Sequence, residues 1–270
     1  MSTKSHTLGK KRRPVFQSAN VISDPAYLES AWLALYERLA EPFAGLLRSN
    51  TGHLVEIGCG RGQLTIPLSR LVANSPITIV DKFAGPYSKD YESLRAALAR
   101  EKLGERVDLE VSDYSSWLLE QPDNKYDAMI SNEFLCEIDS IEMRRFLLEC
   151  HRVLRPTGVT IHGFLSPQAR NSRQRLLIQA DSNPKWTKYP PKEWFSPQPK
   201  SVANQLRRTG FRRVRTRVIR NSLVIKAGAA QQLLTRWDFK ESFWKLHQER
   251  LIREGLEIPD WVVVAGFKYR

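Results

Sequence analysis

The sequence predicts a three-layer α/β fold, in which a sheet of about seven strands is covered by helices on both faces. Two observations support this prediction. Between residues 53 and 165, short apolar segments alternate with longer amphipathic segments, a pattern typical of mostly parallel strands joined by helices. In addition, the first apolar segment runs directly into a cluster of glycines, where α/β proteins place a ligand-binding turn.

The first expected element is a helix. Asp24 is a favourable N-cap, Pro25 suits the first helical position, and Gly52 marks the end of the apolar periodicity. Later apolar segments predict strands at about residues 53–58, 77–81, 107–111, 126–131, 157–164, 211–219 and 261–267. Amphipathic segments predict helices at about residues 63–72, 88–102, 114–120, 140–153 and 199–208, with one or two more at 228–254. A turn is expected at 155–158.

These elements predict one folded domain behind a tail. Residues 1–20 are polar and basic without apolar periodicity, so they are expected to be a flexible tail. Residues 21–270 are expected to form a single domain made of an N-terminal helix region at 21–50, a core at 51–165, a lid at 166–200 and C-terminal strands with a helical insertion at 201–270. The lid is predicted because this segment is rich in proline, lysine and aromatic residues, and aromatic side chains must bury against something.

The positive charge of the chain is concentrated in two segments. The formal net charge is +13 at pH 7, and residues 1–20 supply five Lys or Arg with no acid. Residues 168–228 supply fifteen Lys or Arg against two acids, so the rest of the chain is mildly acidic. Segments of this kind attract an anionic partner such as RNA or an acidic protein, or serve solubility alone. Both interpretations stay open at this stage.

Hydropathy and cysteine content predict the compartment. No apolar stretch approaches the roughly 20 residues that span a bilayer, and no secretory signal follows the basic amino terminus. We therefore expect a cytoplasmic protein that does not enter a membrane. The three cysteines, Cys59, Cys136 and Cys150, form no CxxC pair, which predicts reduced thiols and no metal site.

The glycine cluster, EIGCGRG at residues 56–62, is called the glycine loop below. Glycines at every second position let the backbone turn sharply and approach a ligand closely. A dinucleotide-binding GxGxxG motif would need glycine at position 63 or 65, and a phosphate-binding loop would need lysine at 63. These positions hold Gln63 and Thr65. Together with the acidic Glu56, this pattern favours a cationic ligand over a phosphate.

The glycine loop resembles the E/D-x-G-x-G-x-G motif of class I S-adenosylmethionine-dependent methyltransferases, and every fixed position matches. The resemblance covers about residues 50–165 and the last strand. It implies a Rossmann-like fold with an antiparallel last strand, and S-adenosyl-L-methionine as the cofactor. In this family the loop packs against the methionine part of the cofactor, which assigns that contact here to Glu56, Gly58, Cys59, Gly60 and Gly62.

Residues at the ends of the next two strands complete the implied cofactor site. Asp81 ends the second strand, nineteen residues after Gly62, where a carboxylate accepts hydrogen bonds from both ribose hydroxyls. Lys82 follows it and is assigned to the same site. By the resemblance, Asp113 accepts from the adenine amino group and Tyr114 contributes its backbone amide. Asp113 also suits a cap for the following helix, and this alternative stays open.

The acceptor-handling groups are expected where the fourth and fifth strands end. Ser131 is the last residue of the expected fourth strand and Asn132 follows it, and both are assigned to the cofactor side. Asn132, Glu133 and His162 are the candidate catalytic residues, with Glu133 first as a base or substrate anchor. Each of the last two has a structural alternative: Glu133 as a carboxylate at a helix start, and His162 as a hydrogen-bonded core histidine.

The turn after the fourth strand resembles that of small-molecule methyltransferases. It lacks the [DN]-P-P-[YFW] motif of many enzymes that methylate amino groups of nucleic-acid bases or glutamine. The sequence therefore predicts methyl transfer to an O, N or S atom of an unidentified acceptor. One alternative is an enzyme acting on RNA or protein, gripping its partner with the tail and an arginine stripe at Arg213, Arg215 and Arg217. Another is an inactive cofactor-binding regulatory or scaffold subunit.

Overall fold

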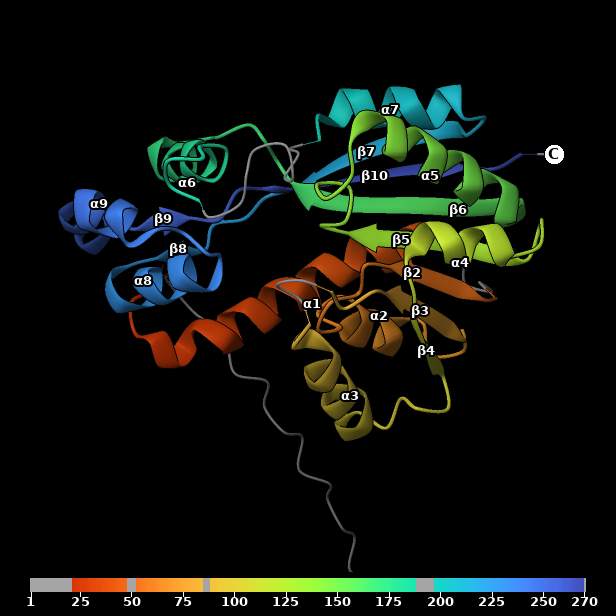
Figure 1. Cartoon of the computed structure of the whole chain (residues 1–270), viewed down its shortest axis with the longest axis horizontal. Helices are drawn as coiled ribbons and strands as arrows, with labels where there is room; N and C mark the ends of the chain where they lie inside the picture. The colour runs from red at the N-terminus through yellow and green to blue at the C-terminus, as the bar shows by residue number, and fades with distance from the viewer. Residues whose placement is uncertain (1–20, 48–51, 85–87, 188–196, 270) are drawn as a thin grey trace, which may run out of the picture.

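The computed structural model of the chain describes residues 21–47, 52–84, 88–187 and 197–269 (Figure 1). Residues 1–20, expected to be a tail, and most of the aromatic stretch of the expected lid fall outside this part. The described residues form a large sheet with helices on both faces and a smaller group of elements at one end of that sheet.

The large sheet has seven strands in the order β4-β3-β2-β5-β6-β10-β7. The neighbouring pairs from β4 to β6 are parallel, whereas β10 runs antiparallel to both β6 and β7. This arrangement confirms the predicted sheet and its antiparallel last strand. The strands are β2 (Leu54–Ile57), β3 (Ile77–Asp81), β4 (Val107–Val111), β5 (Tyr126–Asn132), β6 (Leu154–Leu165), β7 (Arg212–Ile219) and β10 (Trp261–Phe267).

Helices cover both faces of the sheet, as predicted (Figure 1). Asp24 acts as the expected cap, accepting from Ala26 N at 2.9 Å, but it caps a short 3-10 turn, Pro25–Tyr27, that leads into the first helix. One face carries α1 (Leu28–Leu46), α2 (Thr65–Leu71) and α3 (Asp90–Arg100). The other carries α4 (Tyr114–Glu120), α5 (Ser140–Val153) and α7 (Pro199–Arg208).

The central strand β2 shows how the sheet divides the core. Leu54 belongs to the buried cluster on the α1 face, while Val55 and Ile57 belong to the cluster on the α5 face. Successive side chains of a strand point to opposite faces, so Glu56 shares the face of Leu54, beside α2. Because both faces are covered, the strand is an unbroken buried run.

The remaining elements form one unit, called the cap below, beyond the carboxyl ends of β5 and β6 (Figure 1). The expected lid contributes a helix here, and the expected helical insertion contributes two more. The sequence did not predict α6 or the three very short strands, because two-residue strands carry no periodicity. The cap consists of α6 (Ser172–Asp181), α8 (Ala227–Arg236), α9 (Glu241–Arg253) and the sheet of β1 (Val21–Ile22), β8 (Val224–Ile225) and β9 (Leu256–Glu257).

Two buried carboxylates fix α6 within this arrangement. Asp260, just before β10, accepts from Arg170 Nε at 2.9 Å, and Glu257 on β9 accepts from Arg173 Nη2 at 2.9 Å. Gln174 Nε2 on α6 also donates to Glu257 Oε1 at 3.2 Å. Removing one partner of such a pair would leave a buried charge uncompensated, so these contacts hold the cap to the end of the large sheet.

The turn expected at 155–158 needs correction. The helix α5 runs directly into β6, and Tyr126 pairs with Leu154 while Ala128 pairs with Val159, so residues 155–158 bulge out of the strand. Arg155 in this bulge donates to Asp127 Oδ2 at 2.9 Å. The proline and glycine that suggested a turn therefore make a local irregularity in a long strand.

Candidate active site

A cavity of about 370 Å³ lies between the carboxyl ends of the parallel strands and the cap. Its lining comes from the loops that follow β2, β3, β4 and β5, from α1, and from the cap helices α6 and α8. Of the eleven residues assigned to the cofactor, Gly62, Asp113 and Ser131 do not line it. The other eight do, namely Glu56, Gly58, Cys59, Gly60, Asp81, Lys82, Tyr114 and Asn132.

The glycine loop needs its glycines for two different reasons. Gly58, Gly60 and Gly62 have φ angles of 73°, 49° and 74°, which side chains other than hydrogen rarely allow. A Cβ at Gly58 would lie 3.0 Å from the ring of Phe134, and one at Gly62 would lie 2.6 Å from Leu94 Cδ1. Gly62 therefore lies behind the cavity wall, where it lets α3 pack against the loop.

Asp81 holds the glycine loop in place. Its Oδ2 accepts from the backbone N–H of Gly60 at 2.9 Å, and its Oδ1 accepts from the N–H of Phe83 at 2.9 Å. Each carboxylate oxygen retains a second lone pair, and Asp81 lines the cavity. The same side chain thus shapes the loop and presents acceptor atoms at the cavity wall, and its contact with a ribose stays a prediction.

Glu56 is a buried carboxyl at the bottom of the site. It is 2% exposed, and its Oε2 accepts from Thr65 Oγ1 at 2.7 Å. Burial raises the pKa of Glu56 to about 8, the hydrogen bond from Thr65 opposes this rise, and the negative charge of Asp81 adds to it. A cation bound nearby would lower that pKa and stabilise the carboxylate, so the cradle fits a ligand with positive charge.

Asp113 takes the position of a helix cap. Its Oδ1 accepts from Ser115 N at 2.9 Å and from Ser115 Oγ at 2.6 Å, and these bonds hold the pKa of Asp113 below its usual value. Ser112 and Tyr114, on either side of it, line the cavity instead. The capping alternative is therefore present in the structure, and an adenine contact from Asp113 stays a prediction.

His162 and Ser131 belong to the core. His162 is fully buried, with Nδ1 2.8 Å from Ser131 Oγ and Nε2 2.8 Å from Thr160 Oγ1. Its ring also packs edge-on to Phe146 at 5.6 Å. Burial lowers the pKa of His162 to about 3, so the ring stays neutral. The structure thus places His162 away from the cavity wall, as the core-histidine alternative describes, and we assign it no catalytic role.

Asn132 and Glu133, the other two candidates, both line the cavity. Asn132 Oδ1 accepts from Trp261 Nε1 at 3.1 Å. Glu133 has φ of 57°, which is unusual for a residue with a side chain, and its N–H donates to Gly163 O at 2.9 Å. Within the described residues, its buried Oε1 has no hydrogen-bond partner. A strained backbone and an unsatisfied oxygen at one residue are typical of a functional position.

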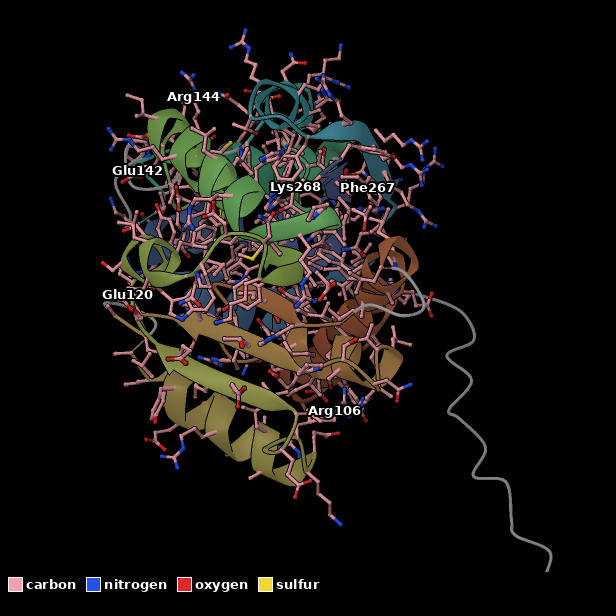
Figure 2. All side chains as sticks on the ribbon, turned by 90° about the vertical axis from the view of Figure 1, so that its right-hand side faces the viewer. Arg106, Glu120, Glu142, Arg144, Phe267 and Lys268 are labelled. Carbon is pink, nitrogen blue, oxygen red and sulfur yellow. The ribbon has the colours of Figure 1, made fainter. Side chains whose placement is uncertain are left out.

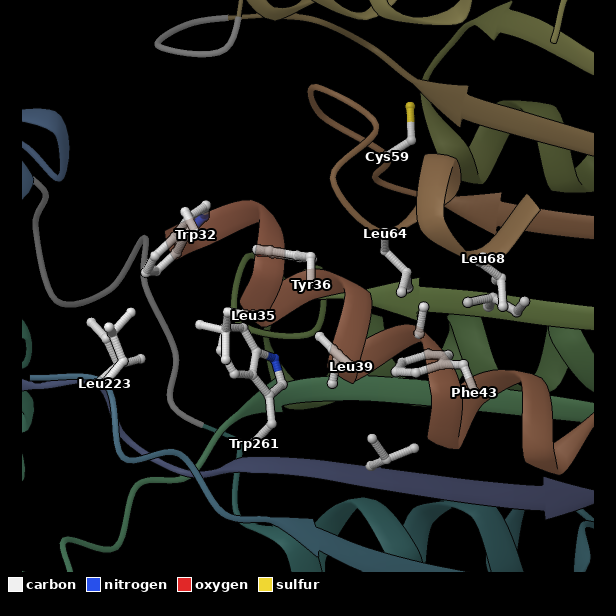
Figure 3. Close-up of a cluster of buried hydrophobic side chains, with 14 of the residues drawn as sticks. Trp32, Leu35, Tyr36, Leu39, Phe43, Cys59, Leu64, Leu68, Leu223 and Trp261 are labelled. Carbon is white, nitrogen blue, oxygen red and sulfur yellow. The ribbon is translucent and has the colours of Figure 1, made fainter. Parts of the chain in front are cut away.

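Four aromatic residues of the wall were missed by the sequence analysis. Trp32 and Tyr36 on α1, Trp237 at the end of α8 and Trp261 on β10 all line the cavity. Figure 3 shows Trp32, Tyr36 and Trp261 close to one another. Because they come from three distant segments, no local motif signals them. On α1, Trp32 and Tyr36 are four residues apart, a spacing typical of any core-facing side of a helix.

One protein family matches the part of the chain that contributes most of the cofactor side of this cavity. Residues 54–158, which contain the glycine loop and strands β2 to β5, match the family model described as a methyltransferase domain. The chain carries a methyltransferase domain. The methyl donor of class I methyltransferases, S-adenosylmethionine, is a cation, which agrees with the buried Glu56 and the close approach allowed by the glycine loop. No curated protein sequence matches this methyltransferase.

Solved structures share the fold of the methyltransferase at low identity. The apo form of the S-adenosylmethionine-dependent methyltransferase SibL is 16% identical, with a TM-score of 0.59, over 90% of this chain but only 57% of SibL. A SAM-dependent methyltransferase from Archaeoglobus fulgidus is 16% identical (TM-score 0.56), over 87% of this chain and 94% of that one. A cyclopropane-fatty-acyl-phospholipid synthase-like protein from Lactobacillus casei is 14% identical (TM-score 0.64), over 91% and 95%.

No group of three or more His, Cys, Asp or Glu in the described part of the methyltransferase is arranged to hold a metal ion. None of its helices has the length and apolar character needed to cross a bilayer.

We expect Asp81→Ala to weaken cofactor binding by about 2–3 kcal/mol, or roughly 30–150-fold, because the ribose loses its acceptor and the glycine loop loses its anchor. Isothermal titration with S-adenosylmethionine measures the affinity. Asp108→Ala, on the exposed face of β4, is the matched control and should bind normally. An unchanged affinity in Asp81→Ala would remove this residue from the site.

We also expect cofactor binding to release a proton from Glu56. With a pKa of about 8, the carboxyl is mostly protonated between about pH 6 and 7.5, and a bound cation favours its ionised form. Affinity should therefore rise with pH across this range. Calorimetry in two buffers of different ionisation enthalpy measures the release, and Glu56→Gln should show less of it. Equal proton release by both proteins would contradict the assignment.

Proposed function

We propose that this methyltransferase acts on an O, N or S atom of a small molecule held between the glycine loop and the cap. One observation carries the proposal: a single cavity joins Gly58 and Asp81 at its cofactor side to Glu133, Trp237 and Asp181 at its cap side. A donor and a small acceptor can therefore lie in contact within one enclosure, which is the main requirement of an in-line methyl transfer.

The residues of the wall have separate roles in this proposal. Asp81 and Glu56 bind and orient the methyl donor. Asn132, fixed by Trp261, and Glu133 face the acceptor, and Glu133 accepts a proton where the acceptor carries one. The cap covers one side of the cavity and so limits access of water to the reacting atoms. The intact cofactor side and the unsatisfied oxygen of Glu133 favour turnover over the alternative of an inactive scaffold subunit.

We further propose that the enzyme acts in the cytoplasm. Cys59, Cys136 and Cys150 are all free and buried, and free thiols persist in a reducing compartment.

The function is tested by following a labelled methyl group. The purified enzyme is incubated with S-adenosylmethionine labelled on the methyl carbon and with a cell extract separated into small-molecule, RNA and protein fractions. We expect label in the small-molecule fraction, and a large loss of transfer, about 100-fold or more, in Glu133→Gln if proton removal is required. Label confined to RNA or protein would contradict the small-molecule proposal.

A second proposal concerns the arginine stripe, for which we propose an RNA strand as the partner. The edge strand β7 carries Arg212, Arg213, Arg215 and Arg217 without an acid. Nitrogen-tipped side chains gather along it beside Phe267 in Figure 2. Within the described part of the chain, none of these arginines forms a salt bridge. Arg213 and Arg215 lie over aromatic rings at 5.1 and 5.6 Å, which orients them while their charge stays accessible.

Salt-dependent binding tests this surface. We expect a single-stranded uridine oligonucleotide to bind with an affinity that falls steeply with salt. The triple variant Arg213, Arg215 and Arg217→Gln should lower the slope of log K against log salt by about 2. Replacement of the exposed Arg95, Arg144 and Arg145 by Gln is the charge-matched control. Weak binding without salt dependence would contradict the proposal, and preferential binding of an acidic peptide would point to a protein partner.

A further inference from the structure

We propose that the methyl acceptor is an amine, bound as its ammonium ion between Glu133 and an aromatic cage, and that Glu133 removes its proton before methyl transfer. The cage consists of Trp32, Tyr36, Trp237 and Trp261. This inference rests on the proposed function and names the substrate class of the same site.

The aromatic cage is formed by rings that contact one another. Trp32 lies 6.0 Å from Tyr36, 5.7 Å from Trp237 and 6.4 Å from Trp261, measured between ring centroids, and Tyr36 lies 5.6 Å from Trp261. The pairs are tilted or edge-on and in direct contact, so the rings form one continuous aromatic wall instead of a parallel stack. All four line the cavity. Aromatic faces on this wall attract an ammonium ion through their electron-rich surfaces.

Glu133 supplies the group that the cage lacks. Its Oε1 is buried and, among the described residues, has no donor. A buried acceptor without a partner costs free energy that a ligand donor can recover. An ammonium N–H is such a donor, and it also carries the charge that a buried carboxylate needs. Glu133 and the cage residues line the same cavity, and the charge of Glu133 adds to burial in raising the pKa of Tyr36.

The charges around Glu133 favour a cation over an anion. Asp181 from α6 and Glu137 from the loop after β5 are the charged groups that add to the burial effect in raising its pKa. Asp238, after α8, and Arg236 line the same cavity, and Arg236 is paired with Glu29 at 2.9 Å. An acceptor bearing a carboxylate or phosphate would face these acidic groups. An ammonium ion is attracted to them, and they offset the charge of the nearby sulfonium.

The transfer can be written with every proton and electron pair assigned. The ammonium N–H proton moves to Glu133 Oε1, which leaves a neutral amine with a free lone pair. That lone pair attacks the methyl carbon, the carbon–sulfur bond breaks, and its electrons stay on sulfur. The product nitrogen gains one methyl group and the positive charge that the sulfonium loses. Burial raises the pKa of Glu133 to about 8, so the carboxylate is basic enough to share this proton.

Ligand binding in the presence of S-adenosylhomocysteine tests the cage directly. The probes are two cations, tetramethylammonium and benzyltrimethylammonium, the neutral analogue benzyl alcohol and the anion benzoate. The binding of each probe is measured by the change in tryptophan fluorescence. We expect at least one cation to bind better than benzyl alcohol, and benzoate to bind least. Trp237→Leu should weaken cation binding by about 3–30-fold while Trp237→Phe retains most of it. Glu133→Gln should also weaken it, whereas Glu120→Gln on α4 (Figure 2) should not.

Methyl transfer to N-methylbenzylamine, phenol, thiophenol and benzoate completes the test. Transfer to the amine, lost in Glu133→Gln but kept in Glu120→Gln, supports the inference. Binding of neither cation, or transfer to phenol, thiophenol or benzoate but not to the amine, overturns it. Calorimetric binding of S-adenosylhomocysteine to the same sample distinguishes failure of this inference from failure of the proposed function. If S-adenosylhomocysteine binds and the cations do not, only the amine acceptor is excluded. If S-adenosylhomocysteine does not bind, the proposed function fails as well.

Discussion

The site depends on a concentration of negative charge where β2 and β3 end. Glu56 is buried with Thr65 as its hydrogen-bond donor, and Asp81 stands close enough to raise its pKa further. Two carboxylates are stable in this arrangement only when the buried one is protonated or when a cation lies beside them. The fold supplies a space for that cation, because Asp81 also fixes Gly60 and so keeps the glycine loop open toward the cavity.

The opposite side of the cavity repeats this principle with different elements. Burial and acidic neighbours raise the pKa of Glu133 to a similar value. A strained backbone at the end of β5 holds this residue in place. The cap completes this side with Trp237, and its position is fixed by the buried pairs of Asp260 and Glu257 with arginines. The polar contacts that attach the cap thus determine the shape of the acceptor side, although they lie outside it.

The sequence predicted most of the sheet and the cofactor side, because both depend on local patterns. Apolar runs define β2 to β5, and the spacing of glycines in the glycine loop is a property of seven consecutive residues. The aromatic cage was not predictable in this way, since Tyr36, Trp237 and Trp261 meet only after folding. The same limit applies to His162 and Asp113. The sequence around a strand histidine, or around an aspartate before a helix, is the same whether the side chain contacts a ligand or a neighbouring residue. In the structure, His162 is hydrogen-bonded to Thr160 and Asp113 to Ser115, so both occupy structural positions. The two-residue strands of the cap have too little pattern to be recognised.

The central claim is that the glycine loop with Glu56 and Asp81 forms a preformed cradle for a sulfonium nucleoside. Thermal unfolding with increasing S-adenosylmethionine or S-adenosylhomocysteine, with adenosine monophosphate as a phosphate-bearing control, tests it most directly. The account predicts a Tm that rises with the logarithm of the concentration of either sulfur compound, and no comparable rise with the phosphate. A folded protein whose Tm does not respond to S-adenosylmethionine or its demethylated product would contradict it.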